Sequence, residues 1–390
     1  MRDEFLVFGQ PVIEELEIAE VVASLRSGWI GTGPKVLRFE RMLEAYLGAR
    51  HVRCVSSCTA ALTLALRALE IGPGDEVIVP AMTFVASANA VELSGATTVL
   101  VDSKPGSGLM DLGAAEAAVG PRTKAILPVH LAGRPMNLNR LRLMSEKHGL
   151  VILEDAAHAI GAEWRGRKIG SSGRAVAFSF YPTKNITTIE GGAIATDDAA
   201  LAAEIERLAL HGLSLGAWQR FSDEGFKHYI AVKPGYKFNM TDVQAAVGIH
   251  QLPRLDAWIK ARAERWARYD ELLAGLPVTL PPPPDPNSRH ARHLYQVLIS
   301  REAGRSRDEV LDALTSHRIG TGVHYIGVHL QPYYRELYGI DPMALPVATD
   351  ISERTLSLPL SPVLTHEDQK DVTGALRQAL SPAVRPRSRT

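Results

Sequence analysis

Short runs of β-branched and other apolar residues alternate with helical patterns from about residue 50 to residue 210. This alternation constrains the fold more than any other feature of the chain. Strands and helices that take turns in this way form a mainly parallel sheet with helices on both faces. We therefore expect an α/β fold. The predicted strands are 51–56, 77–80, 97–101, 124–129, 150–154, 175–180 and 193–196, and the predicted helices are 59–70, 84–93, 138–147 and 198–210.

The alternation stops at residues 211–240, a long irregular stretch rich in aromatic residues. A loop of this length inside a compact domain usually has a function or contacts a partner. We expect a large domain over residues 14–250 and a smaller α+β C-terminal domain over 251–390, with residues 1–13 packing nearby. The elements predicted for the second unit are a long helix over 241–273 interrupted at Pro253, a strand over 294–300, helices over 306–317 and 366–380, and a frayed tail at 382–390.

Composition and charge narrow the class of protein. Apolar residues make up 46% of the chain and charged residues 22%, a balance typical of a globular protein with a sizeable core. The 43 basic and 43 acidic residues cancel, which argues against a nucleic-acid binder and against a polybasic membrane-surface protein. The charged N-terminus lacks the apolar core of a signal peptide, and the apolar stretch 77–91 is too short to span a bilayer. We expect a cytoplasmic protein that binds neither nucleic acid nor membrane.

The two cysteines, Cys54 and Cys58, are separated by three residues. This spacing matches neither a redox C-x-x-C motif nor a zinc-binding pair, and two cysteines cannot form a disulfide framework. We expect two buried thiols in a reducing compartment and no metal site.

Lys184 is the first candidate for chemistry. It follows a predicted strand and a Pro turn, its flank at 175–183 is uncharged, and Gly191-Gly192 comes shortly after it. A lysine at the end of a core strand, beside glycines that permit close backbone approach, fits a residue that forms a Schiff base. The alternative is a solvated surface lysine, which is the usual state of this residue.

Asp155 and the segment 55–62 supply two further parts. Asp155 ends a run of apolar strand residues, at the carboxyl edge of the sheet where open α/β folds bind ligands. Small residues at 55–62 begin a helix, whose amides can bind a phosphate. Each has a plain alternative, since Asp155 can cap a following helix and small residues begin ordinary helices. Together an amine, an anion and a phosphate site are the parts that pyridoxal 5′-phosphate (PLP) needs.

Further motifs lie along the whole chain, and they are Gly28-Trp-Ile-Gly31-Thr-Gly33, Gly72-Pro-Gly-Asp-Glu-Val77, Val129-His130-Leu-Ala-Gly133, the stretches 154–159 and 179–192, Gly235-Tyr-Lys-Phe-Asn239 and Ser357-Leu-Pro-Leu. With these motifs the chain resembles the DegT-type family of sugar aminotransferases, within the fold-type-I PLP enzymes. On Gly320-Thr-Gly-Val-His324-Tyr and the stretch 329–334 it looks most similar to the UDP-4-amino-4-deoxy-L-arabinose aminotransferases.

The resemblance implies a role for each of several residues. Lys184 would form the Schiff base with PLP and then act as the base that moves the proton. Asp155 would pair with the pyridine nitrogen, and His158 would lie near the phenolic oxygen of the ring. The remaining cofactor contacts would be Phe84 stacked on the ring, the Thr59 and Ala60 amides and the Ser179 hydroxyl on the phosphate, and Asn239 reaching the cofactor of the neighbouring subunit in a homodimer with shared active sites.

His324, Tyr325, His329 and Tyr334 are candidates for contacts with the sugar nucleotide, although tyrosines and histidines packed in a small domain fit the sequence equally well. Some members of the family carry His where Lys184 stands and dehydrate their substrates, so the lysine favours transamination. His158, where many 3-aminotransferases carry glutamine, favours a 4-ketosugar.

The resemblance therefore implies ping-pong transfer of an amino group from L-glutamate to the 4-keto carbon of a UDP- or TDP-linked sugar, in cell-surface polysaccharide, lipid A or antibiotic sugar biosynthesis. A 3-ketosugar or a keto-cyclitol is the alternative substrate. An NAD-dependent oxidoreductase needs G-x-G-x-x-G after the first strand, and the glycines of 28–33 are in a different order. A non-catalytic PLP-binding regulator would need a DNA-binding segment, and the sequence has no basic helix of that kind.

Overall fold

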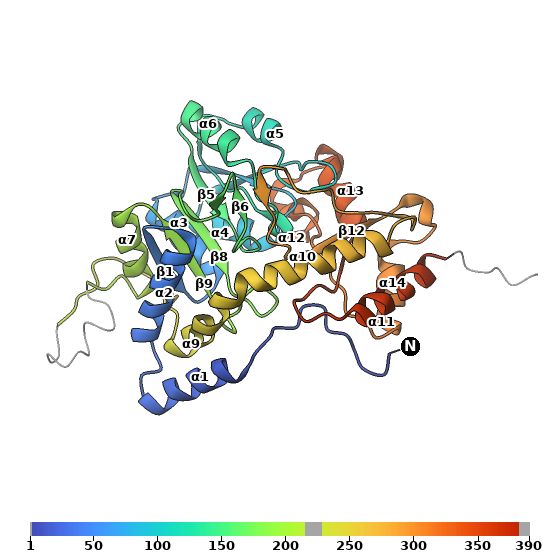
Figure 1. Cartoon of the computed structure of the whole chain (residues 1–390). Helices are drawn as coiled ribbons and strands as arrows, with labels where there is room; N and C mark the ends of the chain where they lie inside the picture. Colours follow the sequence, from blue (N-terminus) through green and yellow to red (C-terminus); the bar gives the residue numbers. More distant parts are fainter. Residues whose placement is uncertain (1, 215–227, 382–390) are drawn as a thin grey trace, which may run out of the picture.

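The computed structural model describes residues 2–214 and 228–381, and its centre is a seven-stranded sheet in the order β1-β9-β8-β5-β4-β2-β3 (Figure 1). Strand β9 runs antiparallel to both β1 and β8, and the other neighbouring strands are parallel. The prediction of a mainly parallel sheet is confirmed. The strands are β1 (His51–Val55), β2 (Glu76–Pro80), β3 (Thr97–Val101), β4 (Thr123–Ile126), β5 (Val151–Asp155), β8 (Ala175–Ser179) and β9 (Gly192–Thr196).

Helices cover both faces of this sheet. Because side chains alternate between the faces of a strand, β8 places Val176 and Phe178 in one apolar core and Ala175 and Ala177 in another. The first core contains α2 (Pro34–Leu47) and α9 (Asp242–Gln251), and the second contains α3 (Cys58–Ala68), α4 (Val85–Ser94) and α7 (Ala199–Ala209). Two further helices of this unit are α5 (Leu112–Ala117) and α6 (Leu138–His148).

A second, smaller unit is built on a three-stranded antiparallel sheet, β10-β12-β13. Its core includes Tyr295, Leu356 and Leu376. The long predicted helix is two helices, α9 and α10 (Leu255–Leu272), joined by a 3₁₀ turn that contains Pro253, and α10 extends towards β12 and α14 (Figure 1). The elements that follow α10 are β10 (Val278–Thr279), β12 (Tyr295–Ile299), α11 (Arg307–Ser316), α12 (Pro332–Tyr338), α13 (Pro346–Arg354), β13 (Thr355–Leu358) and α14 (His366–Leu380).

Residues near the N-terminus lie against this second unit. The Leu6 amide donates to Arg318 O, and the Gly320 amide donates to Leu6 O. The Arg2 guanidinium pairs with Asp368 on α14. The domain boundary between residues 250 and 251 stays a prediction.

Capping residues explain why several helix starts follow from the sequence. Ser306 and Thr365 each accept a hydrogen bond from the third residue of their helix, whose acidic side chain bonds back to the cap. This reciprocal arrangement satisfies two amides at once. The predicted starts of α11 and α14 therefore agree with the structure to within a residue.

Some elements were not predicted. They are α1 (Glu15–Ser27), α2, α5, α12, α13, β10, β13 and a small sheet of β6 (Glu163–Trp164), β7 (Arg167–Lys168) and β11 (Ser288–Arg289). Part of the aromatic loop, 215–227, and the predicted frayed tail lie outside the described residues. None of the described helices is long and apolar enough to cross a membrane.

Candidate active site

Asp155 is the last residue of β5, at the carboxyl edge of the central sheet. Its Oδ2 accepts a hydrogen bond of 2.7 Å from the Ser87 hydroxyl on α4, and its Oδ1 accepts one of 3.0 Å from the Ala157 amide. The next described element after Asp155 is the short strand β6, so the alternative that Asp155 caps a following helix is wrong. The carboxyl group is instead fixed between two elements.

Lys184 follows β8, the strand that pairs with β5. Its backbone amide donates to Tyr181 O at 2.9 Å, which closes the turn after the strand. The side chain is partly exposed, yet its amine lies among buried groups. Burial lowers the pKa of this amine to about 8, against the opposing effects of Cys58 and Asp155. Lys184 is therefore not the solvated surface lysine that the sequence left open as an alternative.

A pocket of about 450 Å³ contains both residues. Its walls come from the carboxyl ends of β5 and β8, the starts of α3 and α4, and the segment of His324 and Tyr325. Most of the predicted site residues lie in these walls. The predicted residues that line it are Thr59, Phe84, Asp155, His158, Ser179, Lys184, His324 and Tyr325.

The start of α3 forms one end of this pocket. Ser57 is the N-cap, and its hydroxyl accepts a 3.0 Å hydrogen bond from the Ala60 amide. The first amides of a helix have no carbonyl of their own helix to bind, so those of Cys58 and Thr59 can bind an anion, whereas the Ala60 amide already has a partner. Gly192 explains the tight geometry, because a Cβ there would lie 2.4 Å from the Ser57 carbonyl carbon.

His158 is buried beside Lys184, and its ring contacts three other residues. The Ala132 amide lies 3.2 Å from Nδ1, and the Tyr325 hydroxyl lies 3.0 Å from Nε2. The His293 ring lies 4.5 Å away between centroids. Burial, and then the nearby Lys184 charge, lower the pKa of His158 well below its usual value, so the imidazole is neutral.

Phe84 is the N-cap residue of α4 and is 55% exposed although it lines the pocket. Its ring lies 5.6 Å from that of Tyr325. An aromatic ring that faces a pocket and is not covered by other side chains can stack on a flat ligand.

His324 lines the pocket and is held by residues far away in the sequence. Its Nδ1 lies 2.8 Å from the Ser357 hydroxyl, and its ring stacks on Phe8 at 5.4 Å. Burial lowers the pKa of His324 to about 3. Residues near the N-terminus therefore reach the wall of the pocket.

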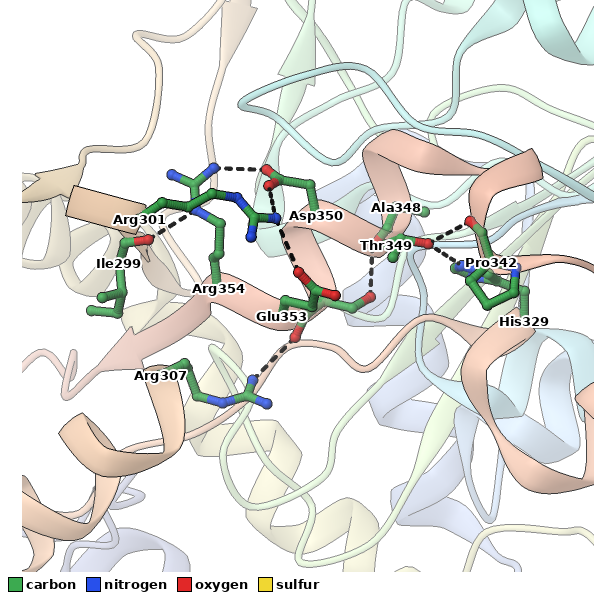
Figure 2. Close-up of polar contacts among 11 residues, drawn as sticks. Ile299, Arg301, Arg307, His329, Pro342, Ala348, Thr349, Asp350, Glu353 and Arg354 are labelled. Atoms are coloured by element: carbon green, nitrogen blue, oxygen red, sulfur yellow. Dashed lines mark hydrogen bonds and ion pairs between the residues drawn. The ribbon is translucent and has the colours of Figure 1, made fainter. Parts of the chain in front are cut away.

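His329 does not lie with the other predicted residues. Figure 2 shows it beside Thr349 and Pro342, where its Nε2 is 2.9 Å from the Thr349 hydroxyl. That hydroxyl donates its proton to Pro342 O, so the imidazole donates to Thr349. His329 is fully buried and absent from the pocket wall. His329 is therefore packed inside the protein, which is the alternative that the sequence left open for it. The same holds for Tyr334, which donates to Asn89 Oδ1.

Asn239 also lies apart from Lys184 in the single chain. Its side-chain amide donates to the Thr32 hydroxyl at 2.7 Å. It lines a different hollow, of about 670 Å³, together with Gly33 and residues of α2. The prediction that it reaches the cofactor of a second subunit stays a prediction.

Ser87, Thr83 and Cys58 were missed as site residues. The Thr83 and Ser87 hydroxyls are 2.8 Å apart, and Ser87 donates to Asp155, so Thr83 donates to Ser87. The i, i+4 spacing of two hydroxyl residues at a predicted helix start could have signalled this pair. Both cysteines are buried, as predicted, and Cys58 additionally lies 3.9 Å from Asp155 Oδ1. The described residues contain no cluster of potential metal ligands.

The groups around the pocket fit PLP. An amine, a carboxyl group with two fixed oxygens and free amides at a helix start surround a space large enough for a substituted pyridine, beneath an uncovered aromatic ring.

A sequence profile of the DegT/DnrJ/EryC1/StrS aminotransferase family matches residues 11–377. The chain belongs to this family. A curated relative, the spore coat polysaccharide biosynthesis protein SpsC of Bacillus subtilis, is 45% identical over 384 residues, which span 98% of this chain and 99% of SpsC.

Solved structures of the family have the same fold. The putative sugar aminotransferase Spr1654 from Streptococcus pneumoniae is 36% identical in its PLP form, with a TM-score of 0.88 over 96% of this chain and 98% of that one. Its PMP form gives 35% identity and a TM-score of 0.89 over 96% and 99%. PseC of Helicobacter pylori, an aminotransferase in pseudaminic acid biosynthesis, gives 28% identity and a TM-score of 0.89 over 97% and 99%.

These findings confirm three predictions from the sequence. The family and the fold are those that the motifs indicated. The enzyme is a PLP-dependent aminotransferase, because the family is one of aminotransferases and Spr1654, one of its relatives, is known in both PLP and PMP forms.

Proposed function

We propose that this enzyme transfers the amino group of L-glutamate to the 4-keto carbon of a sugar linked to UDP or TDP, and that Lys184 binds PLP covalently. The observation that carries the proposal is the presence of the Lys184 amine and the Asp155 carboxyl group in one pocket, with the start of α3 in its wall. PLP, when bound, supplies an electron sink, since its protonated ring stabilises the charge left when a proton leaves carbon.

Lys184 is the residue that moves protons in this proposal. With the pKa of its amine lowered to about 8, part of the amine is neutral near neutral pH. A base whose pKa lies near the working pH transfers protons most efficiently. We infer that Nζ of Lys184 accepts the proton from the α-carbon of glutamate and supplies a proton at C4 of the sugar.

Asp155 has the role of the anion at the ring nitrogen. Ser87 and the Ala157 amide hold its two oxygens in place, so it needs no rearrangement to meet a charged ring. Where a bound ligand excludes water, a fixed charge of this kind is worth more than in solvent.

The phosphate contacts that we propose are the amides at the start of α3 and the Ser179 hydroxyl at the end of β8. The positive end of the helix dipole favours a dianion there. Of the two predicted amides, we retain that of Thr59 and replace that of Ala60 by that of Cys58, because the Ala60 amide donates to Ser57. Phe84 would stack on the open face of the ring.

A homodimer with shared active sites remains part of the proposal. Among the described residues that line the pocket, Lys184 is the only lysine or arginine. Glutamate has two carboxylates and a nucleotide sugar has a diphosphate, so both need further cations. A second copy of the chain is the source that we favour, with Asn239 reaching its partner's cofactor.

The relatives and His158 support the proposed substrate. SpsC takes part in the synthesis of a spore coat polysaccharide and PseC in that of pseudaminic acid, which supports a role in cell-surface polysaccharide synthesis. The 4-keto position and the cytoplasmic location rest on the sequence alone. A lipid A or antibiotic sugar is the other destination consistent with the family.

A coupled assay for 2-oxoglutarate tests the substrate. The enzyme is incubated with L-glutamate and, in parallel, UDP- or TDP-linked 4-ketosugars, a nucleotide-linked 3-ketosugar and a keto-inositol. We expect turnover with a 4-ketosugar. Turnover with the 3-ketosugar or the keto-inositol, and with none of the 4-ketosugars, would contradict the proposed substrate. It would leave the proposed PLP chemistry intact.

A further inference from the structure

The N-terminal segment, residues 5–9, packs against the wall of the pocket. It runs beside the second unit before the chain reaches α1 (Figure 1). Leu6 pairs with the backbone of the second unit through hydrogen bonds of 2.9 and 2.8 Å. Two residues later, the Phe8 ring stacks on the His324 ring, with 5.4 Å between the ring centroids and 23° between the ring planes. Phe8 therefore covers one face of a side chain that lines the pocket.

The same segment also contacts the turn that carries Lys184. A Cβ atom on Gly9 would lie 3.0 Å from the Cβ of Thr183, the residue that precedes Lys184. This separation is closer than side chains usually approach, so glycine suits the position. Thr183 and His324 both line the pocket. The N-terminal segment therefore links two walls of the pocket, one at the edge of the central sheet and one in the second unit.

The hydrogen bond of His324 indicates which of its ring nitrogens carries the proton. Nδ1 lies 2.8 Å from the hydroxyl of Ser357, a fully buried residue. Within residues 2–214 and 228–381, this hydroxyl has no other hydrogen-bond partner. A buried hydroxyl proton without an acceptor costs free energy, so Ser357 donates to Nδ1. Because burial lowers the pKa of His324 to about 3, the imidazole is neutral and has one N–H group, which is therefore at Nε2.

The Nε2–H group of His324 is available to a ligand. Among the residues that the structure describes, none accepts a hydrogen bond from it, and the atom is not fully buried. His324 lines the pocket that contains Lys184. Both substrates of an aminotransferase react in the same pocket, and both have several oxygen atoms. An N–H group in the wall can donate a hydrogen bond to one of these oxygens.

We propose that the N-terminal segment is part of the substrate site. In this inference Nε2 of His324 donates a hydrogen bond to an oxygen of the substrate, which is a carboxylate oxygen of L-glutamate in the first half of the reaction. Phe8 is a positioning residue that holds the His324 ring in this orientation. The inference rests on the proposed function, in which the pocket around Lys184 binds both substrates. The candidates from the sequence begin at Thr59, so the segment is an addition to the site.

Phe8 also has a packing role, which the test has to separate from the positioning role. Its ring packs against an apolar cluster that contains Leu131 and Leu294. Loss of the ring should therefore lower stability as well as substrate binding. A purely structural role would not make the effect of Phe8 on substrate binding depend on His324, so that dependence is the quantity to measure.

The test is a double-mutant cycle of Phe8→Ala and His324→Ala in the enzyme loaded with PLP. Single-turnover absorbance at increasing concentrations of L-glutamate gives the half-saturating concentration. We expect His324→Ala to raise this concentration about tenfold, the effect of a lost hydrogen bond to a charged group. Phe8→Ala should raise it about fivefold and change the maximal rate less than about twofold. Because Phe8 acts through His324, the double variant should show a rise of about tenfold and not of about fiftyfold.

Phe5→Ala is the matched control, because Phe5 is an exposed aromatic residue of the same segment and does not line the pocket. Its half-saturating concentration should be that of the wild type. Phe8→Tyr keeps a ring over His324 and should retain most of the wild-type affinity. If Phe8→Ala does not fold, Phe8→Leu takes its place in the cycle, since it keeps an apolar side chain without a ring.

Nitrogen-15 NMR of the wild-type holoenzyme with labelled histidine gives a readout that needs no variant. It should show His324 protonated at Nε2 alone. A proton on Nδ1 of His324 would overturn the inference, as would a multiplicative effect in the double variant, an unchanged half-saturating concentration in either single variant, or equal effects of Phe5→Ala and Phe8→Ala. Failure of Lys184 to bind PLP covalently, or of the wild type to react with L-glutamate, would instead overturn the proposed function.

Discussion

Two regions form the pocket, and they differ in how strictly the fold determines them. At the carboxyl edge of the central sheet, Asp155 ends β5 and Lys184 follows the neighbouring parallel strand β8. In the second unit, residues 324–329 lie in an irregular segment. The first region brings together the residues that the sequence predicts, whereas in the second His324 and Tyr325 face the pocket and His329 is buried beside Thr349.

The difference has a physical cause. Strands of a sheet have a fixed register, so residues that end adjacent parallel strands lie at one edge whatever their side chains are. An irregular segment has no such register, and the direction of each side chain depends on local contacts. Variants in the two regions should therefore differ in kind: those at the sheet edge should change chemistry, and those around His329 should change stability.

The largest effect is expected for Lys184→Ala. Without the amine, neither the covalent bond to PLP nor the proton transfer is available, and the rate of amino transfer from L-glutamate should fall by a factor on the order of 10³ or more. Single-turnover absorbance with L-glutamate measures this rate. Lys124→Ala, an exposed lysine on β4, is the control and should retain the wild-type rate. Comparable rates in the two variants would contradict the role of Lys184.

A second effect concerns pH. PLP reacts with the neutral amine, and the pKa of the Lys184 amine is lowered from its usual 10.5 to about 8. The neutral fraction therefore rises with pH up to and through pH 8, and binding of PLP to the cofactor-free protein should become about tenfold faster between pH 7 and pH 9. Stopped-flow absorbance measures this rate. An ordinary solvated lysine, with its pKa of 10.5, would instead give a rate that rises about a hundredfold between pH 7 and pH 9 and keeps rising to pH 10.

Ser87→Ala tests the support of Asp155 and should have a smaller effect. The variant leaves one Asp155 oxygen without its 2.7 Å hydrogen bond, which is worth about 1 kcal/mol. We expect the dissociation constant of PLP to rise about fivefold, as measured by fluorescence titration. Ser94→Ala, which removes a hydroxyl bonded to Val91 O on the same helix, should leave it unchanged, and Ser87→Thr should restore most of the affinity. Equal effects of Ser87→Ala and Ser94→Ala would refute the specific role.

The smallest effect on catalysis is expected for His329→Ala. This variant removes a buried imidazole bonded to Thr349, and it should lower the free energy of unfolding by about 1–3 kcal/mol. The KM for the ketosugar should change less than about twofold, because the residue is not in the pocket wall. Thermal melting measures the change in stability, and steady-state kinetics measure the KM. A large rise in the KM for the ketosugar in a stable variant would indicate that His329 contacts the substrate.

The same contrast explains what the sequence could predict. The strands of the sheet follow from their apolar runs, and α11 and α14 from their capping residues. Helix α1 was not predicted because it breaks the usual rule: it buries Glu17 and Ser24, while Leu16 and Leu25 are 62% and 57% exposed. A helix with this pattern gives no apolar face for the sequence to reveal.

In the site, the sequence predicted the position of residues that lie at or after the end of one strand, and their roles stay predictions. The prediction failed where a role depends on a bond between distant segments, as in Ser87 with Asp155 or Ala132 with His158. Such bonds join residues on separate elements, and no spacing in the sequence encodes them. The Ala60 amide lies between these two cases. The sequence predicted the start of its helix, but it did not predict that the Ser57 hydroxyl accepts a hydrogen bond from this amide.

The most direct test of the central claim is chemical. The protein is loaded with PLP, reduced with sodium borohydride and digested, and the modified peptide is identified by mass spectrometry. We predict that the pyridoxyl label is on Lys184. A label on another lysine, or a protein that binds PLP and carries no label after reduction, would contradict the assignment of this site.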